Sequence, residues 1–280
     1  MAEIEFSKTQ GLGNDFIIID GQRVRLADFD LPALAVRMCD RNFGIGADGL
    51  ILIRSSRDVD FKMQIINSDG SEAEMCGNGI RCFARYLLDH GKGRTPLQIE
   101  TLAGIKEVQL VMDGAITTGF KVNMGLPRLD AGEIPVSGYD GPVVSQPLNV
   151  DGQTYEITCV SMGNPHCVIF TDSVDDIDLC AIGPKIETHP AFTSRTNVEF
   201  VQVIKEDEVK VRVWERGCGI TLACGTGACA SVVAGILNGK LSREVTTHLP
   251  GGDLLIEWAE SGEVQMSGPA EEVFTGKFVF

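Results

Sequence analysis

Two cysteines stand in closely similar settings in this sequence. The segment CGNG begins at Cys76 and the segment CGTG begins at Cys224, and an apolar stretch with helical spacing follows each. A cysteine at a helix N-terminus meets unsatisfied backbone N–H groups and the positive end of the helix dipole, which lower its pKa. The glycines let a ligand approach the backbone, and the same N–H groups can hold a carboxylate. Each cysteine is therefore predicted to lie beside a carboxylate site.

Two such thiols suit the inversion of a stereocentre. A thiolate removes the proton from one face of the carbon next to the carboxylate, and a thiol delivers a proton to the other face. Since no pyridoxal cofactor takes up the negative charge, the N–H groups at both helix ends must stabilise the enediolate. The pattern predicts a racemase or epimerase that needs no cofactor and uses Cys76 and Cys224 as catalytic residues.

The second half of the sequence repeats the order of the first. Asn14 precedes Cys76 by 62 residues and Asn164 precedes Cys224 by 60, and both asparagines lead into strand-like segments. A polar residue also stands nine positions before each cysteine. We interpret these matches as a duplication whose copies meet near residues 115–122. Ligand pockets often lie where two similar halves meet, so we expect the active site in the cleft between them.

Short strands alternate with a few helices in the predicted secondary structure, which makes the fold class α/β. Apolar spacing predicts helices at residues 31–40 and 79–90, and a third after Cys224. Residues 125–155 are rich in Gly, Pro and Asp and are predicted as loops and turns. Apolar or alternating runs predict strands at residues 15–20, 49–53, 61–67, 97–99, 106–112 and 116–124.

Charge and composition exclude several classes of partner. The 280 residues include 39 acidic and 24 basic side chains, a net charge of −15 that disfavours binding to nucleic acid or to anionic membranes. No apolar run approaches the roughly 20 residues of a membrane helix, and the N-terminus lacks the features of a signal peptide. We therefore expect a cytoplasmic protein whose partner is a small-molecule substrate.

Other candidate sites have simpler interpretations. The sequence has nine cysteines but no Cys-x-x-Cys pair, and only four histidines, so we predict no metal site. The segment from Gly44 to Gly49 matches the dinucleotide fingerprint G-x-G-x-x-G, but a helix precedes it and a strand follows, the reverse of the order that binds NAD. Cys218 is interpreted as a bystander. Six cysteines are predicted to be buried and inert: Cys39, Cys82, Cys159, Cys167, Cys180 and Cys229.

Longer motifs around these residues resemble those of the diaminopimelate epimerase family. They are GLGNDF near the N-terminus, FGIGADG (43–49), NSDGSEAEMCGNGIRC (67–82), SMGNPHCV (161–168), RTNVEF (195–200) and ERGCGITLACGTGACA (215–230). The motifs run in the family's order over most of the chain. Proline racemase and phenazine-biosynthesis isomerases share the family's fold, but the Gly-Asn-Pro-His and Glu-Arg-Gly signatures are those of the diaminopimelate enzyme.

The resemblance implies a metal-independent and pyridoxal-independent isomerase that interconverts LL- and meso-2,6-diaminopimelate, a precursor of lysine and of peptidoglycan. It implies Cys76 and Cys224 as the proton-transfer residues, with His166 and Glu215 near the thiols. Arg216 is implied to hold a carboxylate, and Glu215 an ammonium group. The implied substrate contacts also include the side chains of Asn14, Asn67, Asn164 and Asn197 and the helix-end N–H groups of Gly77, Asn78, Gly225 and Thr226.

The resemblance also implies the architecture. Two pseudo-symmetric domains, residues 1–118 and 119–269, would each wrap a mixed, mostly antiparallel sheet around a central helix, and strand 270–280 would return to the first. Gly49 stands where the family often has Gln, so a substrate contact at this position could come only from the backbone or from water. Ile220 replaces a commonly acidic residue. Phe274 replaces a tyrosine of the family's dimer interface, and we expect a homodimer.

Three alternatives stay open at this point. Another racemase or epimerase of the same fold would keep both cysteines but act on a different substrate. A thiol peroxidase would also use cysteines of low pKa, although it has no need of two matched carboxylate sites. A non-catalytic amino-acid-binding protein would tolerate the loss of either cysteine.

Overall fold

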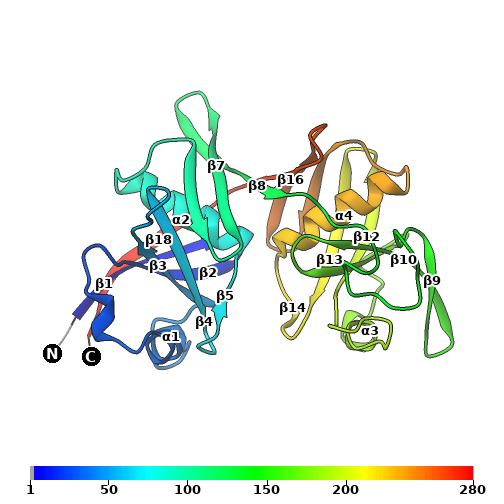
Figure 1. The fold of residues 1–280 in the computed structure, drawn as a ribbon, viewed down its shortest axis with the longest axis horizontal. Helices are drawn as coiled ribbons and strands as arrows, with labels where there is room; N and C mark the ends of the chain where they lie inside the picture. The colour runs from blue at the N-terminus through cyan, green and yellow to red at the C-terminus, as the bar shows by residue number, and fades with distance from the viewer. Residues whose placement is uncertain (1–2, 280) are drawn as a thin grey trace. The chain divides into compact units, whose positions relative to one another are not determined.

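The computed structural model describes residues 3–279, and its contacts divide the chain into two compact units (Figure 1). Unit 1 comprises Met1–Val122 and Ser267–Phe280, and unit 2 comprises Asn123–Met266. The sequence had suggested divisions after residues 118 and 269. Each unit is described by itself below.

Unit 1 is a mixed sheet with a helix against each face. Its elements are β1 (Glu3–Gly11), β2 (Asn14–Asp20), the short 3₁₀ helix η1 (Leu26–Asp28), α1 (Leu31–Cys39), β3 (Gly49–Arg54), β4 (Phe61–Asn67), β5 (Glu72–Ala73), α2 (Gly77–Asp89), β6 (Leu97–Thr101), β7 (Gly104–Asp113), β8 (Ile116–Gly125) and β18 (Glu271–Val279). Strand β18 pairs with β1, so the end of the chain belongs to this sheet.

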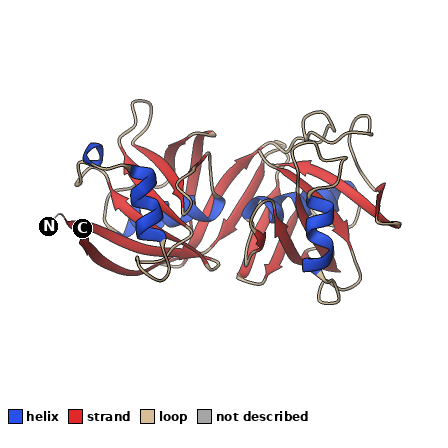
Figure 2. Ribbon diagram, turned by 90° about the horizontal axis from the view of Figure 1, so that it is seen from below, coloured by secondary structure: helices blue, strands red, loops and turns tan. Residues whose placement is uncertain are grey.

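Unit 2 has the same plan. Its elements are β9 (Gln146–Val150), β10 (Gln153–Ser161), β11 (Pro165–Phe170), α3 (Leu179–Glu187), β12 (Asn197–Lys205), β13 (Glu208–Glu215), β14 (Gly219–Ile220), α4 (Gly225–Leu237), β15 (Glu244–Leu249), β16 (Gly252–Trp258) and β17 (Val264–Gly268). Figure 2 shows the helices of both units set among their strands.

Strand pairing demonstrates the duplication. In unit 1, β1 and β2 are antiparallel, β2 and β3 parallel, β3 and β4 antiparallel, and β4 and β6 parallel. In unit 2, β10, β11, β12, β13 and β15 follow the same sequence of pairings. Strand β9 extends β10 antiparallel, as β18 extends β1. The predicted fold class, two pseudo-symmetric domains with mixed and mostly antiparallel sheets, is confirmed.

The central strands are buried on both faces, which explains their unbroken apolar sequences. In unit 1, Ile17 and Ile19 join the core cluster that contains the α1 side chains. The alternate residue Ile18 is also fully buried, as are Phe83 and Leu87 on α2. The sheet thus packs between α1 and α2, and its central strand β3 carries no polar face.

The helices α2 and α4 are the central helices of their units. Both are 13 residues long, and each begins directly after a cysteine that acts as its N-cap. Gly225–Leu237 consists largely of small apolar residues, and most of them are buried. A helix that is apolar all round is stable only when neighbouring elements cover it, and here strands of its own unit contact it.

Parts of the secondary structure differ from the predictions. The segment predicted as loops contains β9 and the start of β10. The helix α3 was not predicted, because Gly183 and Pro184 lie inside it; Gly183 is needed there, since a Cβ would come 2.6 Å from the Trp214 ring. The prediction that Cys180 is buried is wrong, because this residue on α3 is exposed.

Candidate functional site

In unit 1, the helix start holds the Cys76 sulfur by two contacts. The backbone N–H of Gly79 donates a hydrogen bond to the sulfur at 3.4 Å. The thiol in turn donates to Oδ1 of Asn14 at 3.6 Å. Cys76 is half-buried, so the thiol is held in place but retains contact with solvent. This geometry brings together two residues that lie 62 positions apart in the sequence.

The orientation of the Asn14 amide is set by a cluster of charges. Asn14 follows Gly13, whose φ of +81° favours glycine. Its Nδ2 donates to Asp48 at 2.7 Å, and Arg41 bridges Asp48 and Asp15 with 2.7 Å contacts. Burial alone would raise the pKa of Asp15, but hydrogen bonds from Arg41 and Lys8 hold it below its ordinary value. Because the Asp48 carboxyl oxygen accepts from Nδ2, the amide oxygen of Asn14 faces Cys76.

A buried arginine supports the same helix start. Arg81 is fully buried and donates to Oδ1 of Asn78 at 2.9 Å and to the carbonyl of Gly77 at 3.2 Å. Asn78 then donates through Nδ2 to Oδ1 of Asn14 at 3.2 Å. The side chain of Asn78 is therefore engaged in this network. The prediction for Asn78 concerns its backbone N–H group, which these contacts do not involve.

Two other predicted residues of unit 1 lie at the ends of paired strands. Asn67 ends β4 and pairs in register with Gly49, the first residue of β3. The Asn67 amide donates to the Ser71 hydroxyl at 2.9 Å rather than to the residues around Cys76. Gly49 is buried, and a Cβ there would come 3.1 Å from the Ile66 carbonyl. A longer side chain in place of Gly49 would need this backbone to move.

In unit 2, Cys224 stands at the N-cap position of α4 as Cys76 does at α2, but its side chain makes no capping hydrogen bond of the kind that Cys76 accepts from Gly79, and it is only 5% exposed. The hydroxyl of Thr226 lies 3.5 Å from the Cys224 sulfur. Asn164, which follows Gly163 with φ of +100°, donates through Nδ2 to the Thr226 hydroxyl at 3.2 Å. Thr226 thus occupies the place that Asn78 occupies in unit 1.

The chain of hydrogen bonds continues into the core of unit 2. Oδ1 of Asn164 contacts Nε2 of His166 at 3.0 Å, and Nδ1 of His166 contacts Oε1 of Glu199 at 2.7 Å. Both His166 and Glu199 have no solvent exposure. The predicted residues Asn164, His166, Thr226 and Cys224 are therefore brought together, with Glu199 behind them.

The predicted residues Asn197, Glu215 and Arg216 form a neighbouring group. Asn197 is buried; its Oδ1 accepts from the backbone N–H of Arg216 at 2.9 Å, and its Nδ2 donates to the carbonyl of Pro165 at 2.8 Å. One carboxylate oxygen of Glu215 accepts from the Thr221 hydroxyl. The exposed guanidinium of Arg216 donates to the carbonyl of Ser194 at 3.0 Å. Asn197 thereby ties the Glu-Arg-Gly turn to the start of β11.

The electrostatics of Cys224 differ from the prediction for a helix-capping thiol. Burial raises the pKa of Cys224 well above 9.0, and the carboxyl groups of Glu215 and Glu199 raise it further. The Thr226 hydroxyl acts in the opposite direction with a smaller effect. Desolvation therefore outweighs the favourable helix end and favours the thiol form of Cys224.

Sequence reasoning missed three residues of these networks. Asp48, Arg81 and Glu199 all lie inside motifs that the sequence displays, respectively FGIGADG, CGNGIRC and RTNVEF. Their residue types alone gave no sign of which neighbours they would contact. Phe274, the residue predicted at a dimer interface, lies on β18 with 47% of its surface exposed and its ring edge-on to Phe6.

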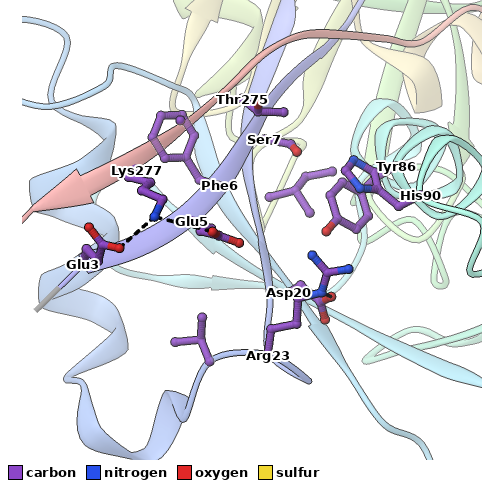
Figure 3. A pocket seen from close by; sticks show the side chains of 13 residues that line it. Glu3, Glu5, Phe6, Ser7, Asp20, Arg23, Tyr86, His90, Thr275 and Lys277 are labelled. Atoms are coloured by element: carbon purple, nitrogen blue, oxygen red, sulfur yellow. Dashed lines mark hydrogen bonds and ion pairs between the residues drawn. The ribbon is translucent and has the colours of Figure 1, made fainter.

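A cavity lies elsewhere in unit 1, and none of the predicted site residues lines it (Figure 3). It measures about 620 Å³, and its lining includes Glu5, Asp20, Tyr86 and Lys277.

Among residues 3–279 no cluster of three His, Cys, Asp or Glu side chains is arranged to hold a metal ion. Within the same range, no helix is both long and apolar enough to span a membrane.

Solved structures with the same architecture identify the fold. A phenazine biosynthesis protein of the PhzF family from Bacillus anthracis superposes with a TM-score of 0.72 at 15% identity, with all of both chains covered. A hydroxyproline epimerase from Agrobacterium vitis gives a TM-score of 0.70 at 12% identity, covering 99% of this chain and 91% of that one. The chain thus has the same fold as these two proteins.

Sequence comparisons identify the family within this fold. The diaminopimelate epimerase family matches residues 6–129 and 158–273. A diaminopimelate epimerase from Pelotomaculum thermopropionicum is 54% identical over 278 residues, 99% of each chain, and diaminopimelate epimerase 1 from Nostoc sp. is 56% identical over 281 residues, 98% of this chain and 99% of that one. The chain belongs to the diaminopimelate epimerase family. The family and the enzyme class predicted from the motifs are confirmed.

Proposed function

We propose that this enzyme interconverts LL- and meso-2,6-diaminopimelate by moving a proton between two cysteines and one α-carbon. One observation carries the proposal: two cysteines cap the buried central helices of two units with matching topology. A second acid–base thiol at the equivalent place is what inversion of a stereocentre requires. Family membership supports the choice of substrate.

The proposed reaction balances without an added reagent. In one direction a thiolate, Cys76 or Cys224, takes the α-proton, so the C–H bond breaks and an S–H bond forms. The electron pair of the C–H bond moves into the adjacent carboxylate to give an enediolate. The other cysteine then donates its S–H proton to the opposite face and becomes the thiolate, and the reverse reaction exchanges the two roles.

The helix starts supply the groups that this intermediate needs. Backbone N–H groups at Gly77 and Asn78, and at Gly225 and Thr226, are proposed to bind the carboxylate of the reacting carbon and the charge that develops there. The exposed guanidinium of Arg216 is suited to the distant carboxylate, and Glu215 to an ammonium group. Asn14, Asn67, Asn164 and Asn197 are proposed to contact the polar ends of the substrate. Gly49 is proposed to contribute only its backbone.

The test measures formation of the meso isomer from the LL isomer by chromatography that separates the stereoisomers. We expect the wild-type protein to form meso product in reducing buffer without added metal or pyridoxal phosphate. Cys76→Ala and Cys224→Ala should each lower the rate by about 10²- to 10⁴-fold, the contribution of a positioned acid or base. No turnover by the wild type would contradict the proposal, and proline and hydroxyproline would then be tested as substrates.

We also propose a homodimer that uses strand β18, which exposes apolar side chains on both of its faces. Val273 is 57% exposed, Phe274 47% and Val279 49%, an unusual number of apolar side chains for one strand facing water. Light scattering of the wild type should give the mass of a dimer, and Phe274→Glu should shift the mass toward the monomer. A wild type that is monomeric at micromolar concentration would contradict this.

We also propose a cytoplasmic location, which suits nine cysteines present as thiols and can be checked by cell fractionation.

A further inference from the structure

Glu199 and His166 form a pair of ionisable side chains in the interior of unit 2. Each has no solvent exposure, and Oε1 of Glu199 lies 2.7 Å from Nδ1 of His166. The second carboxyl oxygen, Oε2, is buried and has no hydrogen-bond partner among the residues that the structure describes. Burial of such a pair is costly, because the groups lose their hydration and the unpartnered oxygen gains no hydrogen bond in return.

The duplication provides a comparison within the same chain. The parallel pairing of β2 with β3 aligns Phe16 with Gly49, and the parallel pairing of β11 with β12 aligns His166 with Asn197. Position 51 in unit 1 therefore corresponds to position 199 in unit 2. At the two places where unit 2 has a histidine and a glutamate, unit 1 has Phe16 and Ile51.

Both pairs lie against the same part of their central helix. A Cβ on Gly79, the third residue of α2, would meet the Ile51 side chain at 3.3 Å and the Phe16 ring at 3.5 Å. A Cβ on Gly227, the third residue of α4, would meet Oε1 of Glu199 at 2.7 Å. Since unit 1 builds this junction from apolar side chains alone, the fold does not require the charged pair of unit 2.

The contacts of His166 determine which of its nitrogens carries a proton. The Asn164 amide donates through Nδ2 to Thr226, so its oxygen faces Nε2 of His166, and Nε2 must carry a hydrogen. Nδ1 then either accepts a hydrogen from a protonated Glu199 or donates one to an ionised Glu199. In both cases one proton lies between Nδ1 and Oε1. The nearby titratable groups are Glu215 on β13 and Cys224 at the start of α4.

In unit 1 the corresponding amide has the reverse orientation. Asp48 accepts from Nδ2 of Asn14, and the amide oxygen faces Cys76. In unit 2 the NH₂ group of Asn164 faces Thr226, whose hydroxyl contacts the Cys224 sulfur. The two cysteines therefore meet opposite ends of equivalent amides: an acceptor at Cys76, and a donor acting through a hydroxyl at Cys224.

We propose that Glu199 is a positioning residue that keeps Nε2 of His166 protonated and thereby holds the Asn164 amide with its NH₂ group toward Thr226 and Cys224. Glu199 does not touch substrate in this account. Its effect passes through His166 and Asn164, and it makes the two proton-transfer sites chemically unequal. The inference concerns the site of the proposed epimerase reaction. Only the predicted effect on kcat rests on that proposed function.

The first test needs no substrate. Nitrogen-15 NMR of the protein, which has four histidines, reports which ring nitrogen of His166 is protonated, and a His166→Phe sample assigns its signals. We expect Nε2 of His166 to be protonated in the wild type at neutral pH. A neutral ring protonated only at Nδ1 would overturn the proposal, whatever reaction the enzyme catalyses.

The second test replaces Glu199 with the side chain that unit 1 uses. Glu199→Ile removes the partner of Nδ1, so the tautomer preference of His166 should be lost in the NMR spectrum. Glu199→Gln can still donate to Nδ1 and should keep Nε2 protonated, which also covers the case that the isoleucine variant fails to fold. A Glu199→Gln variant with the proton moved to Nδ1, or a folded Glu199→Ile variant with an unchanged tautomer, would overturn the proposal.

The effect on kcat distinguishes a positioning role of Glu199 from a purely structural one. A carboxyl group that fixes the tautomer of a histidine can affect rate strongly, and outer partners of a site commonly contribute about 10- to 100-fold. We expect Glu199→Ile to lower kcat for diaminopimelate by that factor and Glu199→Gln to lower it less. Thr247→Val is the matched control, since Thr247 is also fully buried in unit 2 with an unpartnered oxygen, and kcat should not change.

The outcomes separate the two proposals. A wild type that does not epimerise diaminopimelate refutes the proposed function, while the NMR result still decides the role of Glu199. An active wild type whose Glu199→Ile variant is folded and equally active refutes the positioning role alone. Equal loss of activity in Glu199→Ile and Thr247→Val would show that packing of unit 2, rather than the tautomer of His166, is responsible.

Discussion

The matched glycines Gly79 and Gly227 allow the two helix starts to be compared by one substitution each. Both lie third in their helices, two positions past the first helical residue, and neither has a positive φ. Replacing each with alanine changes the same atom in the same local backbone. The surroundings differ, because Gly79 packs against apolar side chains and Gly227 packs against the Glu199 carboxyl.

The expected magnitudes follow from the contacts of the added Cβ. At Gly227 the Cβ would come 2.7 Å from Oε1 of Glu199, about 0.7 Å inside the 3.4 Å at which ordinary contact begins. That oxygen is held by His166 at 2.7 Å, so the carboxyl cannot move without breaking the pair. Overpacking costs about 1–3 kcal/mol, and the better helix propensity of alanine offsets up to about 1 kcal/mol. Gly227→Ala should therefore lower the free energy of unfolding by about 1–2 kcal/mol.

At Gly79 the same change should be nearly neutral. The Cβ would lie 3.3 Å from Cδ1 of Ile51, the end of a flexible side chain, and a shift of a few tenths of an ångström relieves the contact. The gain in helix propensity of up to about 1 kcal/mol then balances the strain.

Urea unfolding followed by circular dichroism measures both effects. We expect the unfolding midpoint of Gly227→Ala to fall clearly below that of the wild type, while the midpoint of Gly79→Ala stays close to it. Gly227→Ala should also lose the NMR signature of protonated Nε2 in His166. Equal midpoints for the two variants would refute the reasoning that the Glu199 carboxyl is held rigidly against α4.

Three further predictions concern single residues. In the ligand-free protein, iodoacetamide should modify exposed Cys218 before Cys224 at neutral pH, and Glu215→Gln should speed the labelling of Cys224 by removing a charge that raises its pKa; peptide mass spectrometry that finds Cys224 labelled first would contradict this. Asp15 has a lowered pKa in the folded state, so it stabilises the fold above its unfolded pKa near 3.8, and this contribution disappears as the pH falls through the lower folded value. Asp15→Asn should therefore reduce thermal stability at pH 7, and the difference from the wild type should shrink as the pH falls below 3.8; a pH-independent difference would count against the ion-pair account. Asp48→Ala removes the acceptor that orients the amide of Asn14 and should raise KM for diaminopimelate by about tenfold, roughly the loss of one hydrogen bond, whereas an unchanged KM would show that the amide needs no such partner.

The sequence predicted the central elements because their burial leaves a clear pattern. The strands at residues 14–20 and 49–54 are covered on both faces, which requires continuous apolar runs that a reader can recognise. Each CGxG segment marks a helix start, because it supplies an N-cap residue followed by small residues that pack closely. The match of the two segments in order and spacing revealed the duplicated plan.

Other features could not be predicted from local sequence. The helix α3 contains Gly183 and Pro184, residues that normally indicate a turn, and only the Trp214 ring packed against it explains the glycine. Strand β9 lies within a segment rich in turn residues, and it is stabilised by pairing with β10. Local propensity is a weak signal when pairing with a neighbour decides the conformation.

The charged residues of the site were the least predictable part. In strand β12, Val198 and Phe200 face the core cluster on the α3 side, so alternation places Glu199 on the opposite face. A single strand gives no sign that a helix covers that face, and a glutamate there would ordinarily be predicted to face solvent. Asp48 and Arg81 were likewise present in visible motifs, but their partners lie far away in the sequence.

The central claim is that one thiol removes the α-proton while another delivers its replacement. Epimerisation of LL-diaminopimelate in deuterium oxide, sampled by mass spectrometry in the first few per cent of reaction, tests this most directly. The account predicts one deuterium at the inverted carbon of the meso product and none in the recovered LL substrate, because each thiol exchanges with solvent but acts on one face. Deuterium appearing equally in recovered substrate and product from the start would mean that a single base serves both faces, and would contradict the account.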